Sequence, residues 1–171
     1  MIRTVRWARI VLYAILPVML LFAFVVDLNP SGVRSLQYPL DRPQALISPL
    51  FPAQRLSAIT EGSQRVLEQP VYFKVRYPHW YEYADLRVVV ETAPAVWRIG
   101  LEVTGAEWSY ALLSPDRTGF VRFDLQNAKI TDGSLRFIIS IDRLESMPFK
   151  IREIQITLHR ESLFETLKRM L

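Results

Sequence analysis

Residues 71–77 read VYFKVRY, and their side chains alternate with the period of a β-strand. Every second position from Val71 to Tyr77 is apolar, and Lys74 and Arg76 lie between them. The further runs with this alternation are residues 84–92, 96–103, 107–114, 119–125, 135–142 and 150–160. About seven short strands, each apolar on one side, predict a mainly β fold. We expect an antiparallel, jelly-roll-like β-sandwich whose two sheets bury their apolar sides against each other.

The composition excludes several classes of site. The chain has 171 residues and no cysteine, which rules out disulfides, thiolate zinc sites and a cysteine nucleophile. Three of the 21 basic residues and one of the 17 acidic residues precede residue 28. Residues 28–171 therefore carry 18 basic and 16 acidic groups. This near balance, without a basic run, argues against a nucleic-acid partner.

The stretch Ile10–Val26 reads IVLYAILPVMLLFAFVV and contains no charged residue. It predicts a transmembrane signal anchor over residues 10–28, with Trp7 at the interface and Pro17 tolerated inside the helix. The basic flank at residues 1–9 predicts a cytoplasmic N-terminus and an extracytoplasmic domain at the plasma (inner) membrane. A buried core helix and a cleaved signal peptide are the alternatives.

The rest of the chain divides into three predicted segments. Residues 29–52 contain five prolines and predict an extended spacer, whose second half carries apolar residues that we expect to pack on the domain. Residues 53–160 form the predicted sandwich, and its first part, 53–69, is compatible with a helical turn or an edge strand. Residues 161–171 predict a short amphipathic helix that begins with a capping box.

The loop between the first two predicted strands carries the candidate binding residues. It reads YPHWYEY and predicts ligand or partner contacts from Tyr77, His79, Trp80, Tyr81 and Tyr83. Aromatic faces beside polar groups suit sugar rings, and they equally suit a protein partner. The third interpretation is a hydrophobic cluster that closes one end of the sandwich.

Three other aromatic residues, Trp97, Trp108 and Tyr110, lie inside predicted strands, where core packing is the expected role. If these side chains point outward, they form a flat aromatic platform. The aspartates Asp116, Asp132 and Asp142 are interpreted as turn formers and not as calcium ligands.

Catalytic patterns are missing from the sequence, which has no nucleophile elbow, zinc-protease motif or nucleotide-binding glycine loop. The carboxylates Glu82, Glu91, Glu102 and Glu107 each fit the exposed side of a strand or its flank. We therefore predict a protein that is not an enzyme and that needs neither a metal nor another cofactor.

Two segments carry a resemblance to a known group of proteins. Ile47–Arg55, which reads ISPLFPAQR, and Gln69–Pro78, which reads QPVYFKVRYP, resemble a pattern in membrane-tethered bacterial β-sandwich domains that accompany transport permeases or envelope assemblies. The later alternation is similar to that of carbohydrate-binding modules, and the resemblance covers roughly residues 47–160. It implies an extracytoplasmic accessory module and no particular reaction.

Together these features predict a single-pass, membrane-anchored accessory or interaction subunit of a cell-envelope complex. The expected partners are the lipid bilayer and a membrane or envelope protein, because a tether raises the effective concentration near membrane partners. The alternative is a membrane-tethered carbohydrate-binding module whose partner is an envelope glycan.

Overall fold

The computed structural model describes residues 13–19, 21, 32–77, 81–92, 96–105, 108–113, 120–141, 144 and 148–160. The chain divides into two units, and all the described strands belong to the unit Val33–Glu161. The other unit comprises Met1–Gly32 and Ser162–Leu171. Among its described residues, 13–19 are helical and exposed.

The predicted membrane anchor falls mostly outside the described residues. Pro17 lies in the helical stretch and is exposed, whereas Trp7, Ile10 and Val26 are not described, and neither is the predicted helix at 161–171. None of the helices in the described ranges is long and apolar enough to cross a membrane. The signal anchor and its orientation stay predictions.

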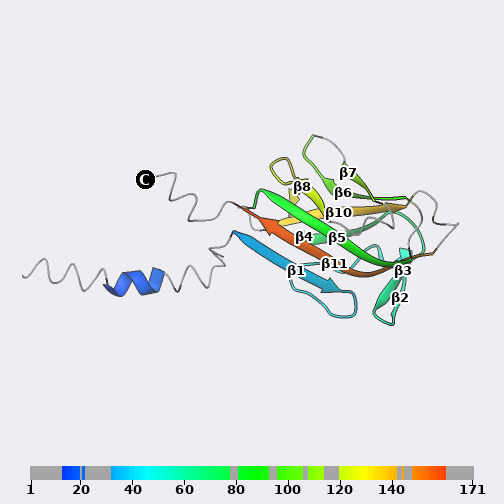
Figure 1. The fold of residues 1–171 in the computed structure, drawn as a ribbon, viewed down its shortest axis with the longest axis horizontal. Helices are drawn as coiled ribbons and strands as arrows, with labels where there is room; N and C mark the ends of the chain where they lie inside the picture. Colours follow the sequence, from blue (N-terminus) through cyan, green and yellow to red (C-terminus); the bar gives the residue numbers. More distant parts are fainter. Residues whose placement is uncertain are drawn as a thin grey trace, which may run out of the picture. The chain divides into compact units, whose positions relative to one another are not determined.

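Two antiparallel sheets make up the unit Val33–Glu161 (Figure 1). The first sheet runs β2-β3-β11-β5-β8, with β1 also paired to β11, and the second runs β4-β10-β6-β7, with β9 paired to β10. The first sheet contains β1 (Val33–Pro39), β2 (Leu56–Thr60), β3 (Ser63–Val66), β5 (Tyr83–Thr92), β8 (Val121–Asp124) and β11 (Phe149–His159). The second contains β4 (Val71–Arg76), β6 (Trp97–Glu102), β7 (Trp108–Leu113), β9 (Ile130–Thr131) and β10 (Ser134–Ile141).

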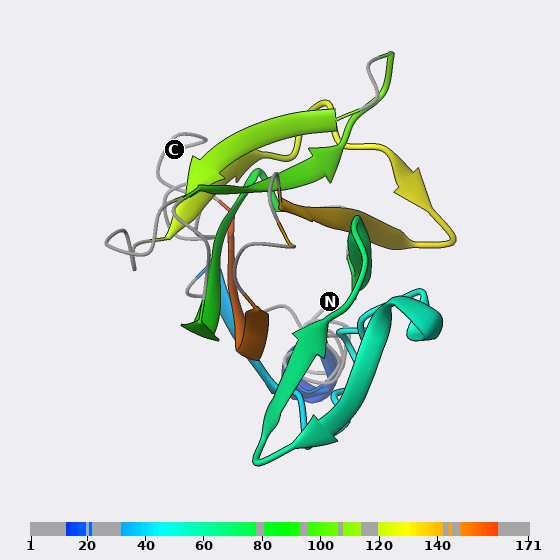
Figure 2. The same cartoon turned by 90° about the vertical axis from the view of Figure 1, so that its right-hand side faces the viewer.

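The apolar sides of the two sheets face each other and form the core. In Figure 2, β11 (orange) belongs to one layer and β7 (yellow-green) to the other. The ring centroids of Phe123 in β8 and Phe137 in β10 lie 5.7 Å apart, and those of Trp97 in β6 and Phe149 in β11 lie 5.2 Å apart. Both pairs join opposite sheets, which confirms the predicted β-sandwich.

The structure corrects the predicted boundary between spacer and domain. Residues 33–39 were expected in a spacer but form β1, which pairs with β11 from Val33↔His159 to Pro39↔Glu153. Leu36 and Tyr38 of this strand are buried in the core. The prolines permit this arrangement because Pro39 ends an edge strand, where a missing backbone donor costs no ladder hydrogen bond.

The predicted number of strands is also corrected, since the described residues hold eleven and not about seven. The seven predicted strands are present as β4, β5, β6, β7, β8, β10 and β11. Residues 53–69 contain both a 3-10 turn, η1 (Ala53–Arg55), and the hairpin β2–β3, so both expectations for this segment hold. The other four strands are β1, β2, β3 and β9, which each have two buried residues or fewer and leave little alternation to detect.

Candidate functional site

Three of the five residues of the predicted loop site are described, and two of these three are buried. Tyr77 and Tyr81 are both buried, and the Tyr77 hydroxyl donates a hydrogen bond to the Tyr81 carbonyl oxygen. Burial raises the pKa of the Tyr77 hydroxyl. The pair belongs to the core cluster, as in the interpretation of a hydrophobic closure. His79 and Trp80 lie outside the described residues.

Tyr83 begins β5 and lies on the outer side of the first sheet, where it joins a compact polar cluster. Its ring stacks on His159 at a centroid distance of 4.6 Å, and the Arg122 guanidinium lies 4.4 Å from the Tyr83 ring centroid. Arg122 also donates two hydrogen bonds to the Asp85 carboxylate, at 2.8 and 2.9 Å.

The polar groups of this cluster already contact one another within the protein. The His159 Nε2 atom lies 3.0 Å from Asp85 Oδ2. The hydrogen bond from Arg122 is the main reason why the pKa of the Asp85 carboxyl is lowered. Because the charged groups are matched to one another, the cluster stabilises the sheet and offers little to a ligand.

The outer side of the second sheet carries a different surface, composed of aromatic rings. On β7, Trp108 and Tyr110 alternate with Ser109, Ala111 and Leu113, and only the last of these five residues is fully buried. Tyr110 is 47% exposed. Core packing, the expected role of Trp108 and Tyr110, is therefore wrong for both residues, and it is right for Trp97, which is 3% exposed.

The strand register explains where the Tyr110 ring lies on the sheet. Tyr72, Ile138, Gly100 and Tyr110 are successive cross-strand partners on β4, β10, β6 and β7. A Cβ atom at Gly100 would lie 2.8 Å from Ile138 Cγ2 and 2.9 Å from Tyr110 Cδ1. Glycine at position 100 thus leaves the space that the Tyr110 ring occupies, and the buried Ile138 forms the apolar floor beside it.

The rings continue across the sheet as a row. The Tyr72 ring centroid lies 5.8 Å from that of Trp108 on one side and 5.6 Å from that of Phe51 on the other. Phe51 is held in place by two backbone hydrogen bonds with Tyr72, at 2.8 and 2.9 Å. We call the outward side chains of Phe51, Tyr72, Trp108 and Tyr110 the aromatic face.

A pocket of about 410 Å³ lies at the Phe51 end of the aromatic face. Its lining residues are Ser48, Pro49, Leu50, Phe51 and Lys74. The Ser48 hydroxyl accepts a hydrogen bond from the Lys74 backbone N–H at 2.8 Å, and the Ser48 N–H donates one to the Lys74 carbonyl at 2.8 Å. The loop is therefore fixed against β4. Pockets of this volume are large enough for a small ligand.

Polar groups lie next to the rings in the neighbouring cross-strand row. There Lys74 is the cross-strand partner of Arg136, and Glu102 is the cross-strand partner of Trp108. The Glu102 carboxylate accepts a hydrogen bond from Lys129 Nζ at 2.7 Å and lies 3.4 Å from Arg136 Nη1. The aromatic face therefore combines apolar rings with hydrogen-bonding groups of fixed position.

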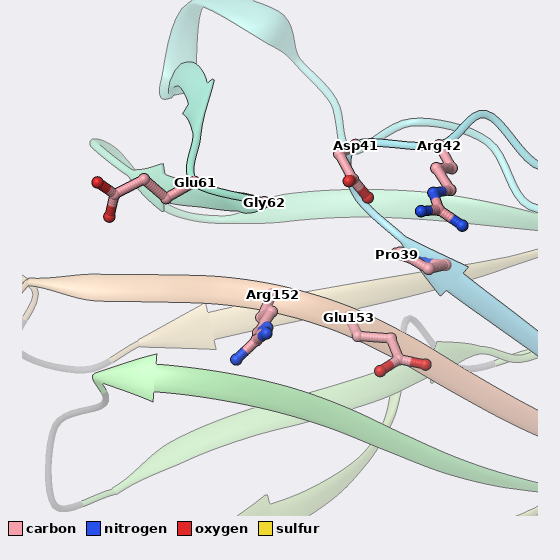
Figure 3. Close-up of a pocket in the computed structure, with 7 residues that line it drawn as sticks. All are labelled: Pro39, Asp41, Arg42, Glu61, Gly62, Arg152 and Glu153. Atoms are coloured by element: carbon pink, nitrogen blue, oxygen red, sulfur yellow. The ribbon is translucent and has the colours of Figure 1, made fainter.

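A second pocket, of about 420 Å³, opens on the first sheet (Figure 3). It lies at the β-bulge of β11, where the pairing partner of this strand changes from β3 to β1. Its lining residues are Pro39, Asp41, Arg42, Glu61, Gly62, Arg152 and Glu153. Figure 3 shows their charged groups spread around the opening without converging on one point.

The described residues contain no group of three histidine, aspartate or glutamate side chains that could hold a metal ion. Two of the four carboxylates named in the sequence analysis, Glu91 and Glu102, lie on different sheets. Glu102 is paired with cations on the second sheet, whereas Glu91 accepts a hydrogen bond from Ser63 on the first.

Sequence reasoning did not single out Phe51 and Tyr72. The strand alternation could have identified Tyr72. Its side chain lies on the same side of β4 as those of Lys74 and Arg76, which is the outward side. Phe51 precedes β4 and reaches the face only through an isolated bridge to Tyr72. The alternation of a single strand does not reveal such a bridge.

Comparisons with known proteins give limited information. No protein family matches the sequence, and no similar sequence is found among curated proteins. Among solved structures, a family two carbohydrate esterase from Cellvibrio japonicus is similar with a TM-score of 0.40 at 13% identity, over 75% of this chain and 34% of that one. The GH26-CBM35 β-(1,4)-mannanase of Podospora anserina has a TM-score of 0.38 at 10% identity, over 74% and 28%.

A third structure, of FLHE, has a TM-score of 0.35 at 13% identity, over 76% of this chain and 99% of that one. The chain thus spans about a third of the length of the first two proteins. At these scores and identities, we take nothing about function from the three similarities.

Proposed function

We propose that this protein is a carbohydrate-binding β-sandwich module, of the jelly-roll-like kind predicted from the sequence, and that the apolar segment 10–26 tethers it to the membrane. The observation that carries the proposal is the aromatic face, with its adjoining pocket, on the outer side of the second sheet. A sugar ring presents C–H groups on its faces and hydroxyls around its rim, so it fits aromatic rings flanked by polar side chains.

The geometry of the row favours one glycan chain over a flat polymer surface. The planes of Phe51 and Tyr72 are inclined by 27°, and those of Tyr72 and Trp108 by 34°. A flat surface cannot touch all three planes at once, whereas a flexible oligosaccharide can turn from one ring to the next. The pocket beside Phe51 and Lys74 then receives one end of the chain.

The position of the aromatic face is compatible with a tether. Val33, at the start of β1, is the register partner of His159, at the end of β11, so the chain enters and leaves the sandwich beside these two residues. Both strands belong to the first sheet, whereas the aromatic face is on the outer side of the second.

The experiment is calorimetric titration of the full-length protein in detergent with a panel of soluble oligosaccharides. Trp108→Ala should weaken the binding of a recognised oligosaccharide by about tenfold or more, because central aromatic contacts carry much of the binding energy of an interface. The matched control is Tyr83→Ala, which removes an aromatic ring from the outer side of the first sheet.

Equal weakening by both substitutions, with folding intact by circular dichroism, would contradict the assignment of the face. Absence of binding to any member of the panel would contradict the proposed function itself. The accessory-subunit role predicted from the sequence remains a prediction, and co-purification of a stoichiometric membrane partner tests it separately.

A further inference from the structure

The outer side of the second sheet is strongly cationic as well as aromatic. Its outward strand positions carry four basic residues: Lys74, Arg76, Arg98 and Arg136. Lys129 reaches the same side through its contact with Glu102. Glu102 is the only acidic residue at the outward positions of the described strands of this sheet. Leaving Arg98 aside, four cations, Lys74, Arg76, Arg136 and Lys129, accompany this one carboxylate.

Glu102 cannot neutralise this charge, because its two oxygens already contact Lys129 and Arg136. Among the described residues, neither Lys74 nor Arg76 makes an ion pair. Lys74 is half-buried and Arg76 is exposed. The uncompensated charge therefore lies on β4, on the strand that also carries Tyr72 of the aromatic face.

The register places two cations side by side at the centre of this charge. Lys74 and Arg136 are direct cross-strand partners on β4 and β10. Like charges at directly opposite positions destabilise a sheet, and a bound anion between them reverses the sign of that interaction. Lys74 also lines the pocket beside Phe51, so this position is accessible to a ligand that contacts the rings.

We propose that the ligand of the aromatic face is an acidic glycan, whose sugar rings contact the aromatic side chains and whose anionic groups bind Lys74 and its neighbours Arg76 and Arg136. This inference rests on the proposed function and names the class of its ligand. A charge-assisted contact to a carboxylate is stronger and more directional than a contact between neutral groups, so a neutral glycan of the same linkage binds less tightly.

The test compares matched ligands with the full-length protein in detergent. The probes are oligogalacturonate, oligomannuronate and a hyaluronan oligosaccharide, each beside its carboxyl-reduced counterpart, with polyphosphate as a polyanion that has no sugar ring. We expect at least one acidic oligosaccharide to bind about tenfold more tightly than its reduced form. Its affinity should fall as NaCl is raised from about 0.05 to 0.5 M, because salt screens exposed charges.

Substitutions then assign the effect to β4. Lys74→Gln should weaken the binding of the acidic oligosaccharide by about fivefold and leave the affinity for the carboxyl-reduced form unchanged. The control, Lys150→Gln, removes a lysine that is half-buried like Lys74 but lies on the first sheet, and it should change neither affinity. A melting temperature near that of the wild type shows that each variant is folded.

The outcomes separate the two proposals. If every acidic oligosaccharide and its reduced form bind with equal affinity, the proposal of an acidic ligand is wrong, and the proposal of carbohydrate binding is unaffected. Binding of polyphosphate as tight as that of any oligosaccharide, and unchanged by Trp108→Ala, would show a simple basic patch and overturn both. Absence of binding of the wild-type protein to every sugar probe would also overturn both the carbohydrate-binding proposal and the acidic-ligand proposal.

Discussion

A substitution at Gly100 tests the packing beneath the aromatic face. Neighbouring side chains leave no room for a Cβ atom at this position, whereas the backbone conformation is one that other residues can adopt. Gly100 is not among the glycines with positive φ. A Cβ atom at this position would lie 2.8 Å from Ile138 Cγ2, and 2.9 and 3.0 Å from Tyr110 Cδ1 and Cε1. Gly100→Ala therefore forces the Tyr110 ring or Ile138, or both, to move.

The expected size of the effect follows from two opposing contributions. Overpacking of a well-packed site costs about 1–3 kcal/mol. Replacement of glycine by alanine in a permitted conformation returns about 0.4–1 kcal/mol, because it restricts the unfolded chain. The free energy of unfolding should therefore fall by about 1–2 kcal/mol. Displacement of the ring should also weaken oligosaccharide binding.

The assay is urea unfolding of Gly100→Ala, both alone and together with Tyr110→Ala. Two of the three close contacts are to Tyr110, so the cost of Gly100→Ala should shrink when that ring is absent. An unchanged unfolding midpoint for the single variant, or the same cost in both backgrounds, would refute the assigned packing.

Three further predictions concern the sandwich. Leu36→Ala should lower the free energy of unfolding in urea by about 2–5 kcal/mol, because Leu36 is only 6% exposed in β1. Val33 is 39% exposed, so Val33→Ala is the control and should cost far less. Equal costs for the two variants would argue against β1 as part of the domain. Since Arg122 lowers the pKa of Asp85, the stabilisation from this pair is full near neutral pH and is lost as the pH falls below about 4. Asp85→Asn should thus cost about 0.5–1 kcal/mol at neutral pH and almost nothing at about pH 2, and a constant difference in denaturation free energy would contradict this. Phe137→Ala should cost about 3–5 kcal/mol, because Phe137 contacts rings in both sheets, and a cost near zero would contradict the inter-sheet core.

Strand alternation predicted the sandwich because most of the seven strands have one clearly apolar side. In β4, for example, Val71, Phe73 and Val75 alternate with half-buried and exposed residues. The same reasoning missed β1, whose Leu36 and Tyr38 are the only inward residues between prolines and polar side chains. A strand with so short an apolar row is recognised only through its partner, β11.

The site was harder to predict, since alternation groups residues without saying which group faces the core. On β7, both groups are partly apolar, and the larger residues, Trp108 and Tyr110, point outward. The position of the Tyr110 ring depends on Gly100 and Ile138, which lie on other strands and provide the space and the apolar floor. The loop aromatics Tyr77 and Tyr81 gave the opposite result, because they are buried.

The most direct test of the aromatic face is fluorine NMR of the protein labelled with 5-fluorotryptophan. The chain has four tryptophans, so each resonance can be assigned by a single Trp→Phe substitution. On addition of a bound oligosaccharide, the Trp108 resonance should shift, and the resonance of the buried Trp97 should stay in place. A shift confined to Trp80, with Trp108 unchanged, would move the binding site to the loop and contradict the central claim.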